Sequence, residues 1–188
     1  MENTLLFRLA GSSALLGIPA LLLSGFFLVL FFGGYGERYG PLNDIFTAVA
    51  LLLLALPAIA VFSLASDETG VWLAVVTWLA VAGMVVGAAG QLLLVAGVIS
   101  LETSFVTGGF GIMPVMAWAV AIVVLSLGSG LLPPSIGWLT IAVLVLSLSL
   151  AIAPGLHLNW VTWSLGILLV AALSAWLGRL GWYLIRLA

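Results

Sequence analysis

The amino-acid sequence predicts an all-α fold, a polytopic membrane protein in which the whole chain, residues 1–188, forms one bundle of six transmembrane helices. Three observations lead to this prediction. The chain is 65% hydrophobic and only 5% charged, whereas a soluble domain carries about 25% charged residues. Apolar runs of about 20 residues, the length that a helix needs to cross the hydrocarbon core, recur along the chain. The segments between these runs are short, which leaves no room for an extramembrane domain.

Glycine, proline and polar residues mark the ends of the apolar runs. The expected spans cover, in order, about residues 10–32, 45–65, 71–98, 112–127, 136–153 and 160–185. The first exceeds the apolar core of a cleavable signal peptide, which has about 7–15 residues, so we interpret it as a membrane helix. The third is the longest and, at about 1.5 Å rise per residue, would be about 42 Å long. It must therefore tilt or project beyond a hydrocarbon core of about 30 Å.

The loops between the spans hold most of the polar residues. Residues 33–44, GGYGERYGPLND, are the most polar stretch of the chain, and a short acidic loop precedes the third span. Residues 100–111 are expected to form a flexible, glycine-rich loop. Pro114 then lies in the first turn of the fourth span, where its missing N–H costs little. Pro133 and Pro134 force a tight turn before the fifth span.

Small residues recur at alternating steps of three and four on the first, third and sixth spans. This spacing places them on one face of a helix and lets two membrane helices approach closely. We expect these three helices to pack tightly, either with each other or with a partner subunit. The expected packing residues are Ser13, Gly17, Ala20 and Ser24, then Gly83, Gly87, Gly90 and Gly97, and finally Ser174, Gly178 and Gly181.

Arginine placement predicts the orientation of the bundle. An even number of spans puts both termini on one side of the membrane, where Arg8, Arg179 and Arg186 lie. Arg38 alone is on the opposite side. Because basic residues accumulate in cytoplasmic segments, we expect cytoplasmic N- and C-termini.

The charged residues exclude several functions. All of them fall in loops or near span ends, so an ion or proton pathway through the spans is not expected. The chain has no lysine for a retinal Schiff base and no cysteine for a thiolate metal site. With four basic residues in total, nucleic acid is excluded as a partner.

Two polar side chains are candidate contacts. Gln91, beside the glycine stripe of the third span, either forms a hydrogen bond to a neighbouring helix, the favoured interpretation, or lines a ligand site. His157 is the only histidine, so a two-histidine haem site is impossible. A turn histidine is usually hydrated, and we expect no metal site.

An enzyme is not expected. Six spans, Gly128-Ser129-Gly130 and a late histidine resemble the arrangement of rhomboid-type intramembrane serine proteases. However, Ser129 and His157 are expected on opposite sides of the membrane, about 30 Å apart. A nucleophile and its base must lie about 3 Å apart.

Most of the tryptophans lie near the expected span ends, as in an aromatic belt. Trp118 and Trp138 are also placed where they could contact a flat pigment or a quinone. The sequence requires no cofactor, and a bound lipid or pigment is compatible with it.

The opening LFRLAGSSALLG, residues 6–17, resembles the start of small six-span bacterial membrane proteins grouped as families of unknown function. This resemblance implies a bacterial inner (cytoplasmic) membrane and no functional residues. In length, span count and small residues of the first helix, the chain is also similar to the substrate-binding components of energy-coupling-factor vitamin transporters. That likeness is one of architecture, which does not establish function.

Two functions follow from these observations. The first is a non-catalytic accessory or structural subunit that packs against other subunits of a larger membrane complex within the lipid bilayer. The second is a small-molecule transporter or substrate-binding membrane component with an outward-facing pocket. Its pocket would involve Tyr35, Tyr39, Gln91, Glu102 and His157.

Overall fold

The computed structural model describes residues 2–152 and 159–188. Within these residues the chain forms six α-helices and one π-helical turn, η1, and no strand. In chain order the elements are α1 (Glu2–Phe32), α2 (Tyr39–Thr69), α3 (Val71–Val95), α4 (Leu101–Val123), η1 (Val124–Gly128), α5 (Pro134–Ile152) and α6 (Asn159–Leu187). Every α-helix of the described residues is long and apolar enough to cross a membrane, which confirms the predicted fold class.

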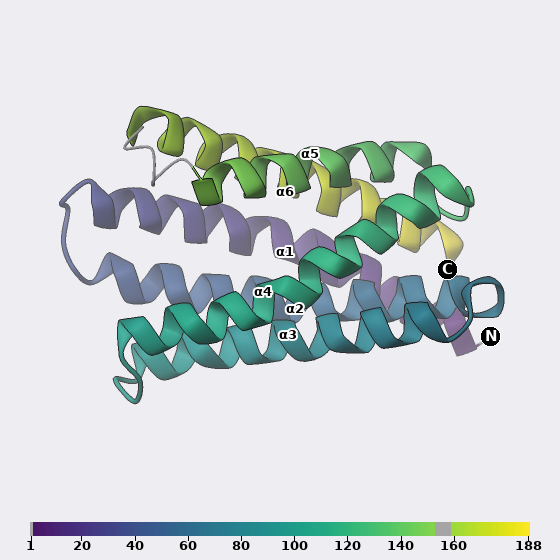
Figure 1. Ribbon diagram of the computed structural model, residues 1–188, viewed down its shortest axis with the longest axis horizontal. Helices are drawn as coiled ribbons and strands as arrows, with labels where there is room; N and C mark the ends of the chain where they lie inside the picture. The colour runs from purple at the N-terminus through teal and green to yellow at the C-terminus, as the bar shows by residue number, and fades with distance from the viewer. Residues whose placement is uncertain (1, 153–158) are drawn as a thin grey trace.

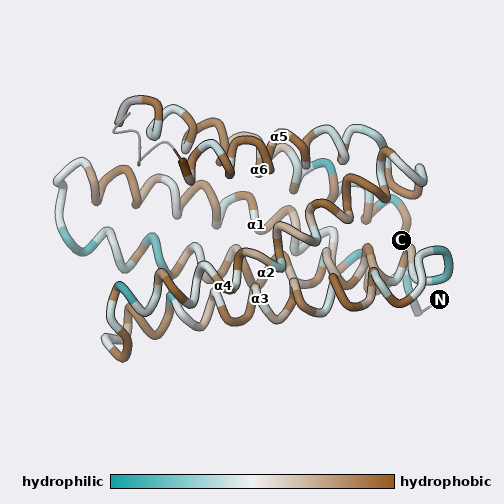
Figure 2. The backbone as a smooth tube through the Cα atoms, in the orientation of Figure 1, coloured by the Kyte–Doolittle hydropathy of each residue, from teal (hydrophilic) through white to brown (hydrophobic). Residues whose placement is uncertain are grey.

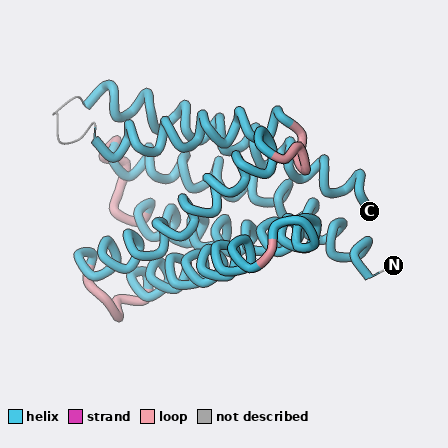
Figure 3. The backbone as a smooth tube through the Cα atoms, turned by 45° about the vertical axis from the view of Figure 1, so that its right-hand side comes forward, coloured by secondary structure: helices cyan, strands magenta, loops and turns pink. Residues whose placement is uncertain are grey.

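The helices form an elongated bundle in which both termini lie at the same end (Figure 1). Each helix packs against the next one in the chain, and α6 packs back against α1, so the helices form a closed ring. In this ring, α4 crosses obliquely from α3 towards α5 (Figure 1). The connecting segments lie at the two ends of the bundle (Figure 3). Hydrophilic stretches concentrate at these ends, while apolar residues dominate the helix bodies (Figure 2).

The second helix begins earlier than the sequence analysis predicted, at Tyr39 rather than at about residue 45. The chain reverses within a few residues after α1, because Gly34 adopts a positive φ of 79° and the Tyr35 N–H donates to the Leu30 carbonyl over 3.1 Å. The Tyr39 ring then stacks on Phe27 of α1, with ring centroids 6.1 Å apart. This contact extends the α1–α2 pair beyond the predicted span.

The fourth helix differs most from its prediction, since residues 101–111 are helical rather than a loop. Ser100 starts α4 by accepting a hydrogen bond from the Thr103 N–H at 3.2 Å. Gly111, expected to be flexible, is a close-contact position: a Cβ on it would lie 2.7 Å from the Gly83 carbonyl oxygen of α3. Pro114 consequently lies inside the helix rather than in its first turn.

The third helix ends at Val95, short of the predicted residue 98. Gly97 lies beyond it with a positive φ of 69°. The Val98 N–H donates to the Leu93 carbonyl at 2.9 Å and the Gly97 N–H to the Leu94 carbonyl at 3.0 Å, which is a Schellman motif. Gly97 therefore terminates α3, and its predicted role in helix packing was wrong.

The small-residue faces bring helix backbones into contact inside the bundle. A Cβ on Gly11 of α1 would lie 2.6 Å from the Gly181 carbonyl oxygen of α6, and Gly83 of α3 faces the Gly111 carbonyl of α4. The first and sixth helices thus pack together as expected. The third helix, by contrast, packs between α2 and α4.

The π-helical turn was not foreseen from the sequence. Its Ser126 hydroxyl donates to the Pro133 carbonyl over 2.5 Å and accepts from the Gly137 N–H over 2.9 Å. This buried side chain joins the end of the α4 segment to the start of α5. It therefore fixes the turn through which α5 returns to pack against α6.

The α1–α6 contact yields a stability prediction. A Cβ on Gly181 would lie 2.8 Å from the Gly11 carbonyl oxygen and 3.1 Å from the Ala14 Cβ, whereas one on Gly166, on the same helix, meets nothing within 4 Å. Replacing Gly181 by valine should destabilise the protein by about 1–3 kcal/mol through overpacking. Thermal unfolding in detergent should show a lower midpoint for Gly181→Val than for Gly166→Val. Equal midpoints would contradict this packing.

Candidate functional site

Four of the polar residues predicted to form an outward pocket, Tyr35, Tyr39, Gln91 and Glu102, lie towards the end of the bundle opposite the termini. Tyr35 follows the end of α1, Tyr39 begins α2, and Glu102 is in the first turn of α4. Gln91 is partly buried near the end of α3, and none of the hydrogen bonds among the described residues involves its side chain. His157 lies outside the described residues. The side chains of Tyr35, Tyr39, Gln91 and Glu102 do not line either of the cavities described below.

The expected packing residues are distributed over several helix pairs. On α1, the Ser13 hydroxyl donates to the Leu53 carbonyl of α2 over 2.6 Å, Gly17 faces Leu177 of α6, and Ala20 is buried. Gly87 of α3 faces Leu51 of α2, whereas Gly90 faces the Thr107 hydroxyl of α4. On α6, Gly178 faces Ile18, and the buried Ser174 hydroxyl has no hydrogen-bond partner among the described residues.

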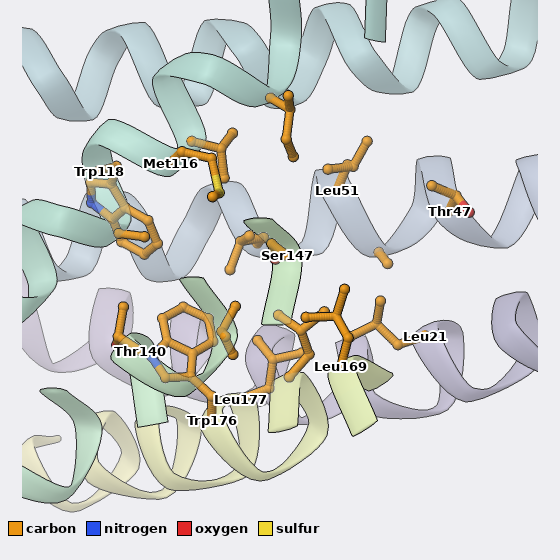
Figure 4. A pocket seen from close by; sticks show the side chains of 17 residues that line it. Leu21, Thr47, Leu51, Met116, Trp118, Thr140, Ser147, Leu169, Trp176 and Leu177 are labelled. Atoms are coloured by element: carbon orange, nitrogen blue, oxygen red, sulfur yellow. Dashed lines mark hydrogen bonds between the residues drawn. The ribbon is translucent and has the colours of Figure 1, made fainter. Parts of the chain in front are cut away.

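An apolar cavity of about 230 Å³ lies inside the ring of helices (Figure 4). Its walls come from α1, α2, α4, α5 and α6, so five helices must pack in register to form it. No charged side chain is among the described residues that line it. Because an apolar cavity of this size in a protein stays dry and accepts apolar guests, its chemistry is that of a binding site for hydrocarbon.

Aromatic residues define one end of this cavity. Trp118 of α4, 1% exposed, and Trp176 of α6, 4% exposed, meet edge to face with ring centroids 5.9 Å apart. The Trp176 Nε1–H donates to the Thr140 hydroxyl over 2.8 Å, and Thr140 in turn donates to the Ile136 carbonyl of its own helix over 2.7 Å. Trp118 is thus a core residue and not part of an aromatic belt. Trp138, in contrast, is 64% exposed.

Polar side chains define the other end, where α1 and α2 meet. Thr47 of α2 lines the cavity and lies away from Trp118 in Figure 4. Its hydroxyl lies 2.8 Å from that of Ser24 on α1. Ser24 also donates to Asn43 Oδ1 over 2.8 Å, and Asn43 Nδ2 donates to Asp44 Oδ1 over 3.0 Å. A single hydrogen-bonded chain therefore runs from a carboxylate to the cavity wall.

A larger groove, of about 850 Å³, lies between α1 and α6 with a contribution from α5. Leu21 of α1 and Leu169 of α6 line both this groove and the cavity. Figure 4 shows these two side chains together at the same end as Thr47. The two spaces are therefore neighbours, because these two leucine side chains line both of them.

Neither a metal-ligand group nor the serine considered as a nucleophile lies at the cavity in the part of the chain that the structure describes. Among the described residues, no group of histidine, cysteine, aspartate and glutamate is placed to hold a metal ion. The Ser129 hydroxyl, considered above as a nucleophile, donates to the Leu125 carbonyl of its own turn over 3.0 Å. The polar residues that line the cavity carry hydroxyls and indoles, and two of them, Thr140 and Trp176, are hydrogen-bonded to each other.

Sequence reasoning did not identify Thr47, Thr140 or Trp176. Each is an ordinary residue of an apolar helix, and its partner is on a different helix. Only one feature of the sequence could have pointed to the polar end of the cavity. In the run from Asn43 to Thr47, polar residues continue past the predicted start of the second span. Those residues were assigned to a loop or to a helix start.

The hydrogen bond at the aromatic end yields a second prediction. Replacing Thr140 by valine leaves the buried Trp176 N–H without its acceptor, which should destabilise the protein by about 1–3 kcal/mol. Thr103→Val, at an exposed hydroxyl, is the matched control. In a thermodynamic cycle with Trp176→Phe, the double variant should lose less stability than the sum of the single variants. Strict additivity would show that the bond contributes nothing.

No protein-family model matches the chain, and no curated protein or solved structure is detectably similar to it. The resemblances to small six-span bacterial proteins and to vitamin-transporter components thus stay predictions. The function of this chain is inferred below from its own residues and their geometry.

Proposed function

We propose that this chain is a non-catalytic integral membrane protein that holds the alkyl chain of a membrane lipid inside its helix bundle. The observation that carries this proposal is the apolar cavity lined by residues of five helices. Its surroundings supply dispersion contacts and almost no hydrogen-bonding groups, so water gains little by entering it. An alkyl chain fills such a space without desolvating any polar group.

The route to the cavity supports a lipid as the occupant. Because the helices span the membrane by length and composition, the groove between α1 and α6 adjoins lipid rather than water. A chain that enters this groove lies next to the cavity, because Leu21 and Leu169 line both spaces.

A role as an accessory subunit of a larger membrane complex, in a bacterial inner membrane with cytoplasmic termini, is part of the same proposal. Its support is the apolar surface of the bundle and the shortness of the described loops. The small-residue faces do not support an accessory role, because they pack inside the bundle. They lie in the contacts between α1 and α6 and between α3 and its neighbours. Chains that co-purify in fixed proportion from the native membrane would favour this role.

A small-molecule carrier is the second candidate. The observation that favours it is the side-by-side arrangement of groove and cavity, which would let a membrane-soluble molecule enter from the bilayer. A carrier must also release its ligand on a second path. Net movement of a lipid between two vesicle populations, dependent on this protein, would favour the carrier over a static lipid-binding subunit.

Filling the cavity tests the proposal directly. Ala119 of α4 lines the cavity, while Ala117 on the same helix is exposed. In Ala119→Phe the added ring should occupy the space of the alkyl chain, so the variant should lose most of its co-purified lipid. Native mass spectrometry of protein extracted in mild detergent measures the bound mass.

The matched control is Ala117→Phe, which adds the same ring outside the cavity and should keep the wild-type lipid content. Circular dichroism and thermal unfolding of both variants check that the bundle is intact. If folded wild type carries no lipid, or if the two variants retain it equally, the cavity is not the lipid site and the proposal is wrong.

A further inference from the structure

We propose that an anionic phospholipid binds on the outer face of α6, with its phosphate at the Arg179 and Arg186 guanidinium groups and its acyl chains along the apolar part of the same face. This site is on the surface of the bundle, so it is separate from the cavity and does not rest on the lipid proposed there. It follows from the order of side chains on this face, the contacts of the two arginines and the distribution of charge along the chain.

One exposed face of α6 changes from apolar to basic along its length. Its residues follow each other at steps of three and four, the spacing that places side chains on one face of a helix. This α6 outer face consists of Leu168, Ala171, Ala175, Arg179, Trp182 and Arg186, all exposed. The alanines project little and leave space for a chain against the helix, and the cations follow towards the end of the bundle. A phospholipid has the same order, with apolar tails towards the membrane centre and a charged head at the surface.

A hydrogen bond holds Arg179 at the end of the bundle. Its Nε–H donates to the Ser135 hydroxyl over 2.9 Å. Ser135 is the second residue of α5, directly after the segment that connects η1 to α5. Arg179 lies about 12 Å before the end of α6, yet its guanidinium group is beside a connecting segment, and these segments lie at the bundle ends (Figure 3). The charge is therefore at the level where basic side chains of membrane helices meet lipid headgroups.

Most of the hydrogen-bonding capacity of Arg179 is available to a ligand. A guanidinium group carries five N–H donors in one plane. Arg179 uses its Nε donor at Ser135, and no hydrogen bond among the described residues uses its two terminal nitrogens. Two parallel N–H groups match two oxygens of one phosphate, which makes arginine the preferred residue for bidentate phosphate recognition.

Arg186 supplies a second cation on the same face. Its Cζ lies 5.1 Å from the centroid of the Trp182 ring. Trp182 precedes Arg186 by one turn and follows Arg179 by one turn, so this cation–π contact turns the Arg186 side chain back along α6 in the direction of Arg179. Neither arginine has an ion-pair partner among the described residues. Their two charges are therefore left for an anion from outside the chain.

The distribution of acidic residues favours a net negative ligand. Residues 103–188 contain no aspartate and no glutamate. Asp67 and Glu68 lie at the end of α2, and α1 packs between α2 and α6 in the ring. A zwitterionic headgroup would bring a third cation to the two arginines, whereas an anionic headgroup brings none. The α6 outer face should therefore select phosphatidylglycerol over phosphatidylcholine.

Arg38 provides a matched comparison at the opposite end of the bundle. Its Cζ also lies over an aromatic ring, 5.0 Å from the centroid of Tyr39. However, Glu37 precedes it directly, and Asp44 follows within the first two turns of α2. These two carboxylates reduce the attraction of Arg38 for an anion, so an arginine on an aromatic ring is not by itself sufficient for the site.

The test is competition between phosphatidylglycerol and phosphatidylcholine with identical acyl chains. Delipidated protein in neutral detergent is given equal amounts of both, and native mass spectrometry measures the ratio bound. Wild type should prefer the anionic lipid by at least about fivefold, the contribution of one basic residue near an anionic lipid surface. Arg179→Gln and Arg186→Gln should each reduce the preference, and the double variant should bind both lipids equally. Arg38→Gln removes the same charge and should keep the wild-type preference.

Circular dichroism and thermal unfolding check that each variant is folded. If folded wild type binds the two lipids equally or binds neither, or if Arg38→Gln loses the preference as the double variant does, the inference is overturned. Excess inorganic phosphate should leave the lipid bound, because it has no acyl chains. Displacement by phosphate would show a site for free anions and would also overturn the inference.

The cavity variant Ala119→Phe keeps this test independent of the proposed function. Because the α6 outer face lies outside the cavity, Ala119→Phe should retain the preference for the anionic lipid even where it loses the lipid of the cavity. Loss of the headgroup preference in folded Ala119→Phe would mean that the cavity, and not the α6 outer face, selects the lipid.

Discussion

The backbone contact between Gly11 and Gly181 is the constraint on which the rest of the bundle depends. In a membrane the helices gain no hydrophobic free energy by leaving lipid, so association relies on close packing and interhelical hydrogen bonds. A Cβ on Gly11 would lie 2.6 Å from the Gly181 carbonyl oxygen, so larger residues are incompatible with this approach. This contact joins the last helix to the first and closes the ring.

The same two helices also form the groove. They touch at Gly11 and Gly181, near the termini, and the groove lies further along them, beside Ser24 and Gly166. The pair is therefore closely packed near the termini and hollow further along. This asymmetry places an apolar space beside lipid while the bundle stays held together, which a lipid-binding protein needs. The hydrogen-bonded chain at Ser24 then gives this space a defined polar end.

The sequence was sufficient for the fold class, because composition and run length alone require membrane helices. The α1–α6 pairing was also within reach, since both helices carry small residues at contact spacing. The start of α4 was missed because glycines that usually mark a loop are, at Gly111, needed for contact with Gly83. The cavity could not be foreseen at all. Thr47, Trp118 and Trp176 gain their roles only from neighbours on other helices, and no local pattern records which helices are neighbours.

An experimental structure of the protein purified with its native lipids tests the central claim most directly. The account predicts elongated density inside the helix ring, extending from Thr47 towards Trp118 and Trp176, with α1 and α6 in contact at Gly11 and Gly181. A cavity closed by rearranged side chains, or one that holds only ordered water, would contradict it.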